Sequence, residues 1–468
     1  MCPFRSCAPR QIRLFSALVT LTEKIMALAS GKRSVRPGDN VWVNVDILMT
    51  HDVCGPGTIG VFKREFGANA KVWDKEKVVI IPDHYIFTAD SKSNRNVDIL
   101  RDFVREQGLK YFYDVIDNAN GHWVFDPSRG QLKRQYGSSF AGVCHTALPA
   151  KGHTRPGEIL LGTDSHTCMA GAFGEFATGI GNTDAGFVLG TGKLLLKVPE
   201  TMRFWLEGKL QRGVMAKDVI LHCIGDIGFD GATYRAMQFD GPGAKALNMD
   251  DRMTIANMAI EAGGKNGIFE PDETTFTYVD DRTKKNATKS KYDPIFCDKN
   301  QEFVYDKKFD LSKLEPTVAC HPNPGVRKLA KELGNITLDR AYIGSCTGGK
   351  TSDFLAFAEV IKGRKVKIDT FGVPATPDVV TELQSSKVWD VLEAAGVQMT
   401  ENASCAACLG GPTDTFGRMN RPMKCISATN RNFPGRMGHL ESQVFLASPY
   451  TVAASALTGK ITDPREYL

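Results

Sequence analysis

Short apolar runs alternate with helix-like stretches through about the first 200 residues of the chain. NVWVNVDIL, KVVIIPDHY and EILLGTDSHT have the pattern of strands, whereas NRNVDILRDFVREQG and LTEKIMALASG have that of helices. The second of these helices begins near Leu21 and is closed by a Gly. Strands that alternate with helices are typical of α/β units.

Two further blocks follow. The second runs from Arg203 to about Leu314. It contains Asn257 and Glu261, which are four residues apart and are predicted to share one helix face. It closes with the polar stretch DDRTKKNATKSKYDPIF, which we expect to be a surface excursion or linker. The third begins near Glu315. Its pattern predicts helix GVRKLAKELG, strand DRAYIGS, helix SDFLAFAEVIKG, strand KVKIDTFGV, helix TPDVVTELQSSKVWDVLEAAG and strand VQMTE.

The length of 468 residues leaves room for roughly three domains of about 150 residues each. We predict α/β domains over 21–202, 203–314 and 315–468, with 1–20 as a transit or disordered segment. That segment carries Arg5, Arg10 and Arg13 and no acid before Glu23, a pattern typical of organelle import that a short basic tail would share.

Composition excludes several classes of protein. With 42% hydrophobic and 24% charged residues the chain has the balance of an ordinary globular protein, and no apolar stretch approaches the roughly 20 residues that a spanning helix needs. The net charge of +5 is spread along the sequence, so no basic stripe indicates a nucleic-acid surface. The 12 cysteines are not spaced like a disulfide framework.

Three polar motifs come directly after predicted strands. They are Thr50 to Asp52, Pro82 to His84, and Thr163 to Thr167. Ligands of open α/β sheets collect beyond the carboxyl ends of the strands, so these motifs can converge although they are far apart in sequence.

Three cysteines are the strongest candidates for chemistry. Cys346, in AYIGSCTGGK, and Cys405 and Cys408, in SCAACLGG, follow predicted strand ends, and Cys346 precedes a helix whose N-terminus favours a thiolate. Three thiolates suit an iron–sulfur cluster with one iron left open. Three alternatives remain: a zinc site, a redox pair, or simply buried cysteines. The nearest candidates for a fourth zinc ligand are Cys425 and His439, and neither has the spacing of a zinc knuckle. We expect the other internal cysteines to be core residues: Cys54, Cys144, Cys168, Cys223, Cys297, Cys320 and Cys425.

GTDSHT, IGSCTGGK, SCAACLGG and TNRNFPGRMG, in this order, resemble the aconitase superfamily, and within it the large subunits of the isopropylmalate isomerases of plant and plastid type. The resemblance runs from about Leu21 to Leu468 and includes MTHDVCGPGTIGVF, LASPYTVAASALTG and TDPREYL. It implies three α/β domains of aconitase type around a central cluster-containing cleft, without the mobile fourth domain. It also implies one 4Fe-4S cluster with a labile iron, held by Cys346, Cys405 and Cys408.

The resemblance also implies roles for residues around that cluster. Asp83 and His84 match the family's acid pair, His145 and Asp164 a second pair, and His166 the residue that pairs with Glu261. These six form the implied catalytic set. The implied substrate-binding set is Ser165, Asn257, Asn430, Arg431, Arg436 and, by a looser match, His51. Two arginines suit a substrate with two carboxylates.

The implied activity is that of a hydro-lyase that interconverts 2- and 3-isopropylmalate through isopropylmaleate in leucine biosynthesis. The sequence has no counterpart of the Gly-Ser-Ser-Arg-Glu motif of the fourth domain, so we expect a separate small subunit to supply the base and form a heterodimer. Alternatives are the large subunit of homoaconitase or of a methylthioalkylmalate isomerase, a cluster-sensing RNA-binding regulator, and a zinc-stabilised scaffold. The expected location is the plastid stroma, or the cytoplasm if 1–20 is no transit segment.

Overall fold

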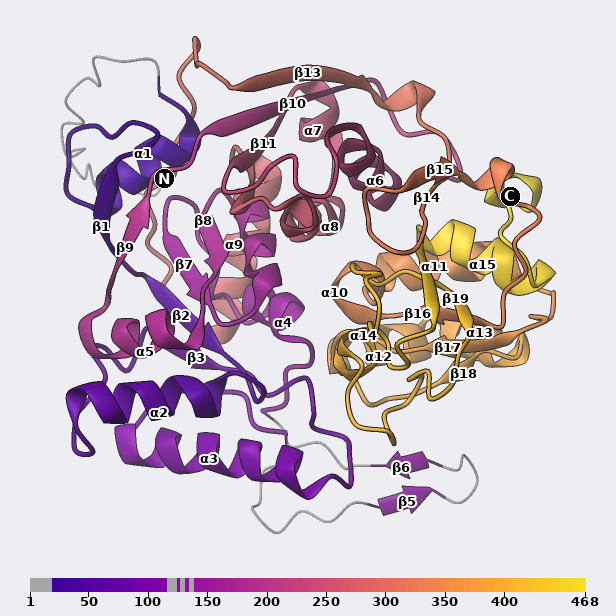
Figure 1. Ribbon diagram of the computed structural model, residues 1–468, viewed down its shortest axis with the longest axis horizontal. Helices are drawn as coiled ribbons and strands as arrows, with labels where there is room; N and C mark the ends of the chain where they lie inside the picture. Colours follow the sequence, from indigo (N-terminus) through magenta and orange to yellow (C-terminus); the bar gives the residue numbers. More distant parts are fainter. Residues whose placement is uncertain (1–18, 116–123, 127–130, 134–138) are drawn as a thin grey trace, which may run out of the picture.

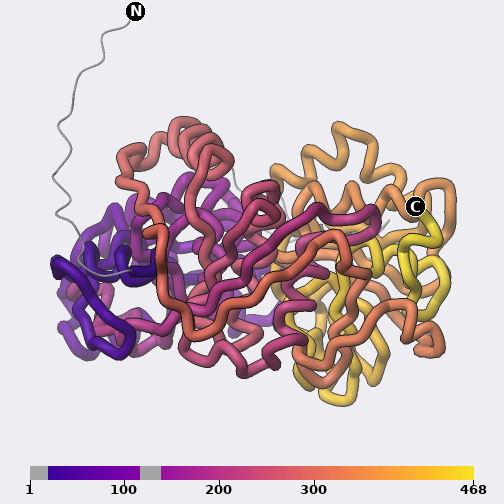
Figure 2. Tube along the Cα trace, turned by 90° about the horizontal axis from the view of Figure 1, so that it is seen from above, coloured from indigo at the N-terminus to yellow at the C-terminus, as the bar shows by residue number. Residues whose placement is uncertain are grey.

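The computed structural model describes residues 19–115, 124–126, 131–133 and 139–468. Most of the predicted transit segment lies outside these residues. In the described part, three large sheets each take their strands from one stretch of the chain. Figure 1 shows the first sheet on the left, the third on the right, and strands of the second crossing above them. Seen from above, the earliest described residues, in indigo, and the last, in yellow, lie at opposite ends of the described part (Figure 2).

The first sheet is parallel and has five strands. Its order is β4 (Tyr111–Phe112), β3 (Val78–Ile80), β2 (Ile47–Thr50), β7 (Ile159–Gly162) and β8 (Phe176–Gly179). Around it lie α1 (Leu21–Ala29), α2 (Gly55–Phe66), α3 (Ser91–Gln107), α4 (Cys144–Ala150), the 3₁₀ helix η1 (Ser165–Phe173) and α5 (Asn182–Thr191). Two small antiparallel pairs accompany it: β1 (Asn40–Asn44) with β9 (Lys193–Lys197), and β5 (Val124–Asp126) with β6 (Gln131–Lys133).

The second sheet is parallel, with the order β12 (Asn266–Phe269), β11 (Ala236–Asp240), β10 (Thr201–Glu207) and β13 (Tyr305–Asp310). Its helices are α6 (Ala216–Ile227), α7 (Pro242–Ala246), α8 (Met249–Asn257), the 3₁₀ helix η2 (Met258–Ala262) and α9 (Glu273–Asn286).

The third sheet has seven strands, of which five are mutually parallel. The order is β15 (Arg327–Leu329), β14 (Thr317–Ala319), β20 (Gln443–Leu446), β19 (Lys424–Ser427), β16 (Arg340–Ile343), β17 (Asp369–Gly372) and β18 (Gln398–Met399). Its α-helices are α10 (Ser345–Gly348), α11 (Thr351–Ile361), α12 (Pro377–Ser385), α13 (Val388–Ala394), α14 (Ala406–Leu409) and α15 (Pro449–Thr458). Short 3₁₀ helices are η3 (Leu311–Lys313), η4 (Ala330–Glu332) and η5 (Pro464–Glu466).

Local sequence signals account for several of these elements. β2, β3 and β7 are buried on both faces, as expected of parallel strands covered by helices. α1 begins with a capping box between Thr20 and Glu23, and α3 begins at an Asp90 cap and ends at Gly108 with φ 64°. Among the described residues no helix has both the length and the apolar character to cross a membrane. The strands of the three large sheets lie within 47–179, 201–310 and 317–446. We therefore still propose domains over 21–202, 203–314 and 315–468. The first strand of the second sheet, β10, begins at Thr201, two residues before the proposed boundary.

Two predictions of local structure were wrong. Residues 325–334 form β15 and η4 rather than one helix, because Arg327–Leu329 pairs with β14 and leaves Val326 exposed. The helix predicted over 376–396 is two helices separated by Lys387, which has φ 64°. The polar stretch predicted as a surface excursion or linker begins inside α9, and its remainder, 287–296, contains no helix or strand.

The second and third parts of the chain share a core. One buried cluster joins Phe204 and Phe239 of the second sheet to Tyr342 of β16 and to the cysteine loops. The cysteines therefore lie where two sheets meet.

Candidate active site

The three polar motifs converge because β3, β2 and β7 are neighbours in the first sheet. Each motif follows the carboxyl end of one of these strands, where parallel sheets place their ligands. A hydrogen bond of 2.9 Å between the hydroxyls of Thr50 and Thr163 joins two of the loops. His51, His84 and Asp164 are thereby brought to one place.

Asp83 and His84 form a buried ion pair. His84 Nδ1 lies 2.6 Å from Asp83 Oδ1, and the Cys144 amide donates to Asp83 Oδ2 at 2.7 Å. Burial lowers the pKa of His84, but the carboxylates of Asp83 and then Asp164 outweigh it and raise that pKa to about 10. Burial raises the pKa of Asp83, yet the charge of His84 holds it below its usual value. His84 is therefore an imidazolium at neutral pH.

Asp164 lies at the centre of four histidines. Its Oδ1 is 2.9 Å from His145 Nε2 and 3.3 Å from His166 Nδ1. Its Oδ2 is 3.6 Å from His84 Nε2 and 3.9 Å from His51 Nε2. Although burial raises the pKa of Asp164, His145 and His166 hold it well below the usual range.

His51 differs from its neighbours. Its ring stacks on that of His84 at 4.4 Å, and its buried Nε2 has no hydrogen-bond partner. Burial, followed by the charge of His84, lowers the pKa of His51. His51 is therefore a neutral imidazole beside the charged His84, and its unpaired Nε2 can bind a ligand.

A second set of ion pairs connects a residue that follows the first sheet to one in the third part of the chain. His166 Nε2 lies 2.7 Å from Glu261 Oε1, and Arg431 Nε and Nη2 reach the same carboxylate at 2.9 Å and 2.8 Å. Glu261 is fully buried. Burial raises its pKa, but Arg431 and His166 together hold it below the usual value. The prediction of a shared helix face was inaccurate, since α8 ends at Asn257 and Glu261 belongs to η2.

The three cysteines are buried and share polar neighbours. Asn257 and Asn430 donate to Cys346 Sγ at 3.1 Å and 3.4 Å, and Cys408 Sγ lies 3.2 Å from Asn430 Oδ1. The mutual influence of the two thiols raises the pKa of Cys405 and, together with the charge of Arg436, lowers that of Cys408. Asn430 therefore joins Cys346 to the Cys405–Cys408 turn.

The spacing of these sulfurs distinguishes between metals. A zinc ion holds thiolates at about 2.3 Å, so two sulfurs on one ion lie within about 4.6 Å of each other. In the described part of the chain, two groups bring three or more donor atoms within 4.8 Å of one another, and both consist of His and Asp. The three sulfurs, with or without Cys425 or His439, form no such group. At least one pair of these sulfurs is therefore farther apart than one zinc ion would hold it, whereas a polynuclear cluster spreads its thiolates over several irons.

The remaining predicted substrate residues surround the same place. Ser165 Oγ lies 3.3 Å from His166 Nδ1, and Asn430 Nδ2 donates to Asn257 Oδ1 at 3.1 Å. Arg436 has a buried Nε with no hydrogen-bond partner, and its charge lowers the pKa of Cys408. An orphaned guanidinium N–H beside the cysteines fits a site that takes up an anionic group.

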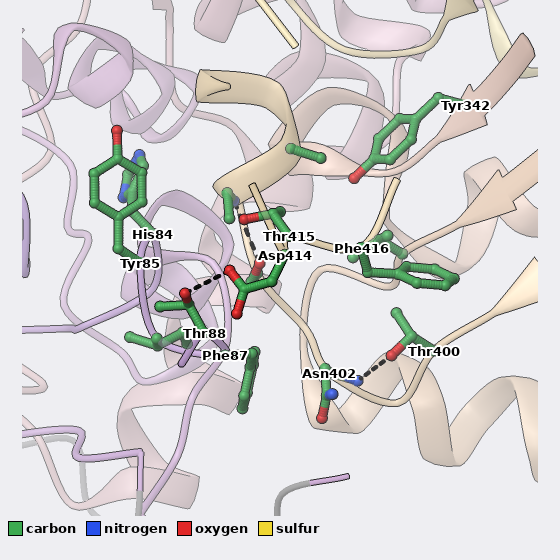
Figure 3. A pocket seen from close by; sticks show the side chains of 15 residues that line it. His84, Tyr85, Phe87, Thr88, Tyr342, Thr400, Asn402, Asp414, Thr415 and Phe416 are labelled. Atoms are coloured by element: carbon green, nitrogen blue, oxygen red, sulfur yellow. Dashed lines mark hydrogen bonds between the residues drawn. The ribbon is translucent and has the colours of Figure 1, made fainter. Parts of the chain in front are cut away.

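A cavity of about 230 Å³ adjoins this site (Figure 3). His84 lines it together with Ala406 and Ala407, the two residues between Cys405 and Cys408. Asp414 also lines it and joins the third part of the chain to the first, accepting hydrogen bonds from Thr88 Oγ1 at 2.6 Å and from the Ala89 amide at 2.7 Å.

Sequence reasoning missed two buried residues that support the site. Asp52 Oδ1 accepts the amides of Asp83 and His84 at 2.9 Å and 3.0 Å, and its Oδ2 accepts that of Tyr85 at 2.7 Å. It sits in the motif that supplied His51, so its position was a usable signal. Lys217 lies behind the Cys346 loop. Nothing in the pattern of α6 distinguishes it from a surface lysine.

The chain matches the aconitase family (aconitate hydratase) over residues 23–334 and 326–459. It is 55% identical over 478 residues to the chloroplastic 3-isopropylmalate dehydratase large subunit of Arabidopsis thaliana, covering 100% of this chain and 90% of the relative. The large subunit 1 of Methanopyrus kandleri is 42% identical, and the large subunit of Acetivibrio thermocellus is 41% identical. Each match covers 96% of this chain and 99% of the relative. The chain therefore belongs to the aconitase family.

Proposed function

We propose that this chain is the cluster-binding large subunit of an isopropylmalate isomerase, which interconverts 2- and 3-isopropylmalate by dehydration and rehydration in leucine biosynthesis. The relatives named 3-isopropylmalate dehydratase large subunit, which align over nearly the whole chain, support it. The observation that carries it is that a charged histidine from the first sheet lies around one site with two arginines and three buried cysteines from the third part of the chain.

The proposed cofactor is a 4Fe-4S cluster held by Cys346, Cys405 and Cys408. The burial of the three thiols and the cations near Cys408, Arg436 and His166, support this proposal. When bound, the cluster supplies a Lewis-acidic iron that polarises the hydroxyl to be removed.

The protein side of the proposed reaction rests on proton transfer and anchoring. His84, kept charged by Asp83, is the candidate general acid, because its Nε2 faces the site and can protonate the leaving hydroxyl. Asp164 fixes the orientation of His145, which, like His166, lines the same place. Arg436, with its free Nε, and Arg431, held by Glu261, are the candidate anchors for the two substrate carboxylates.

We propose that a small subunit completes the enzyme as a heterodimer. The relatives are named as large subunits, which implies such a partner, and the sequence has no counterpart of the serine motif expected to remove the substrate proton. We also propose a plastid location, supported by the chloroplastic relative.

Kinetics of the reconstituted heterodimer test this proposal. The anaerobically reconstituted chain is mixed with the small subunit and given 2-isopropylmalate, homocitrate or a methylthioalkylmalate in parallel. We expect the highest kcat/KM for 2-isopropylmalate and no turnover by the chain alone. Preference for homocitrate or the methylthio substrate would reassign the enzyme, and turnover without the partner would refute the two-subunit mechanism.

A further inference from the structure

Lys217 of α6 is a buried lysine whose hydrogen-bond partners are all neutral. The residue is 1% exposed, and its Nζ donates to Thr347 Oγ1 at 3.2 Å, to the Ala428 carbonyl at 2.8 Å and to the Thr429 carbonyl. Three oxygens use the three donors of an ammonium group. Among the described residues, no carboxylate forms a salt bridge with it. The nearby Asp353 is paired with Lys350 instead, at 2.8 Å.

The oxygens that Lys217 binds flank the cysteine site. Thr347 follows Cys346 in α10, and its hydroxyl also donates to the Ala428 carbonyl at 2.9 Å. Ala428 and Thr429 lead directly into Asn430, which contacts Cys346 and Cys408. One ammonium group from the second part of the chain therefore binds both backbone segments that position these sulfurs.

A buried charge without an opposite charge is costly, and proteins pair such charges or neutralise them. Burial and the charge of Lys350 lower the pKa of Lys217, the charges of Asp353, Cys346 and Cys408 oppose them, and the net pKa is about 7. Thiolates at the cysteines would therefore supply the anionic partner that the described contacts lack.

We propose that Lys217 is the counter-charge and positioning residue of the cysteine site, holding the Cys346 turn against the Asn430 segment and balancing the thiolates. This inference rests on the proposed cluster. It assigns to α6, in the second part of the chain, a direct part in cluster retention.

Three substitutions separate charge from hydrogen bonding. Lys217→Met removes both, Lys217→Gln keeps hydrogen-bond donors without charge, and Thr347→Val keeps the charge but removes one oxygen. Each full chain is loaded anaerobically with iron and sulfide. The rate of cluster loss to a chelator is then measured, and the reduction potential is determined by a spectroscopic titration.

We expect both Lys217 variants to lose the cluster about 10- to 100-fold faster, the effect typical of residues that support metal ligands. Their potentials should fall, since removing a positive charge disfavours the reduced cluster, while Thr347→Val keeps the wild-type potential. A Lys217→Gln chain with wild-type lifetime and potential would overturn the inference alone. If Lys217→Met does not fold, the comparison of Lys217→Gln with Thr347→Val decides. A wild-type chain that takes up no iron would refute the proposed function together with this inference.

Discussion

Replacing Asp83 by Asn removes the negative charge closest to His84. The two side chains are buried and 2.6 Å apart, and Asp83 is the main reason that the pKa of His84 reaches about 10 against the effect of burial. The difference between the ordinary pKa of 6.5 and a pKa of about 10 corresponds to roughly 5 kcal/mol of stabilisation of the imidazolium, at about 1.4 kcal/mol per pKa unit. An amide in its place keeps the size and a hydrogen bond but not the charge.

The substitution should therefore bring the pKa of His84 back toward 6.5. At pH 8 an imidazole with a pKa of about 6.5 is protonated about 3% of the time, so a rate that needs the imidazolium falls by about 30-fold. At pH 6 the same imidazole is protonated about 76% of the time, so the loss should be only about 1.3-fold. The same raised pKa makes the stability of the fold depend on pH. The raised pKa of His84 contributes stability that is present below pH 6.5 and lost as the pH rises through about 10.

The assay is kcat/KM of the reconstituted heterodimer from pH 6 to pH 10, followed by the absorbance of the unsaturated intermediate. Asp272→Asn is the matched control, because it breaks another carboxylate pair, with the buried Arg252 at 2.7 Å, away from the histidines. We expect the alkaline limb to move to lower pH in Asp83→Asn and not in the control. Equal losses at pH 6 and pH 8 would refute the role of Asp83 in keeping His84 charged.

Further outcomes follow from the same contacts. Asp52→Asn leaves one of the three backbone amides that Asp52 accepts without a good partner. We therefore expect kcat to fall about 10-fold with little change in KM, as measured by steady-state kinetics together with a thermal unfolding curve. Arg431→Lys replaces a fork that contacts Glu261 through two nitrogens, so KM should rise about 10-fold or more, and an unchanged KM would count against carboxylate anchoring. Cys408→Ser should abolish iron binding, whereas the buried Cys425→Ser, in β19, should keep it, as judged by iron and sulfide content.

Much of the arrangement of the site could be predicted from the sequence. The motifs at His51, His84 and Asp164 follow apolar runs short enough to be strands, and parallel strands end at a common edge. Their convergence therefore needed no long-range information beyond strand adjacency. The Cys346 and Cys408 motifs also follow strand ends, and they are distinctive enough to indicate the family.

Other features depend on tertiary contacts that no local pattern encodes. Residues Arg327–Leu329 have an acceptable helical pattern and still form β15, because β14 offers a partner edge. Lys387 interrupts a predicted helix in a left-handed conformation that its sequence does not signal. The sequence around Lys217 is that of an ordinary helix, and the lysine is buried only because the third part of the chain, including Ala428, packs against it.

The most direct test is chemical analysis of the chain purified without oxygen. The account predicts about four irons and four acid-labile sulfides per chain, with one iron lost first on exposure to air. It also predicts that removing any of Cys346, Cys405 or Cys408 abolishes binding. One zinc per chain with no sulfide, or full iron content in a chain lacking Cys346, would contradict it.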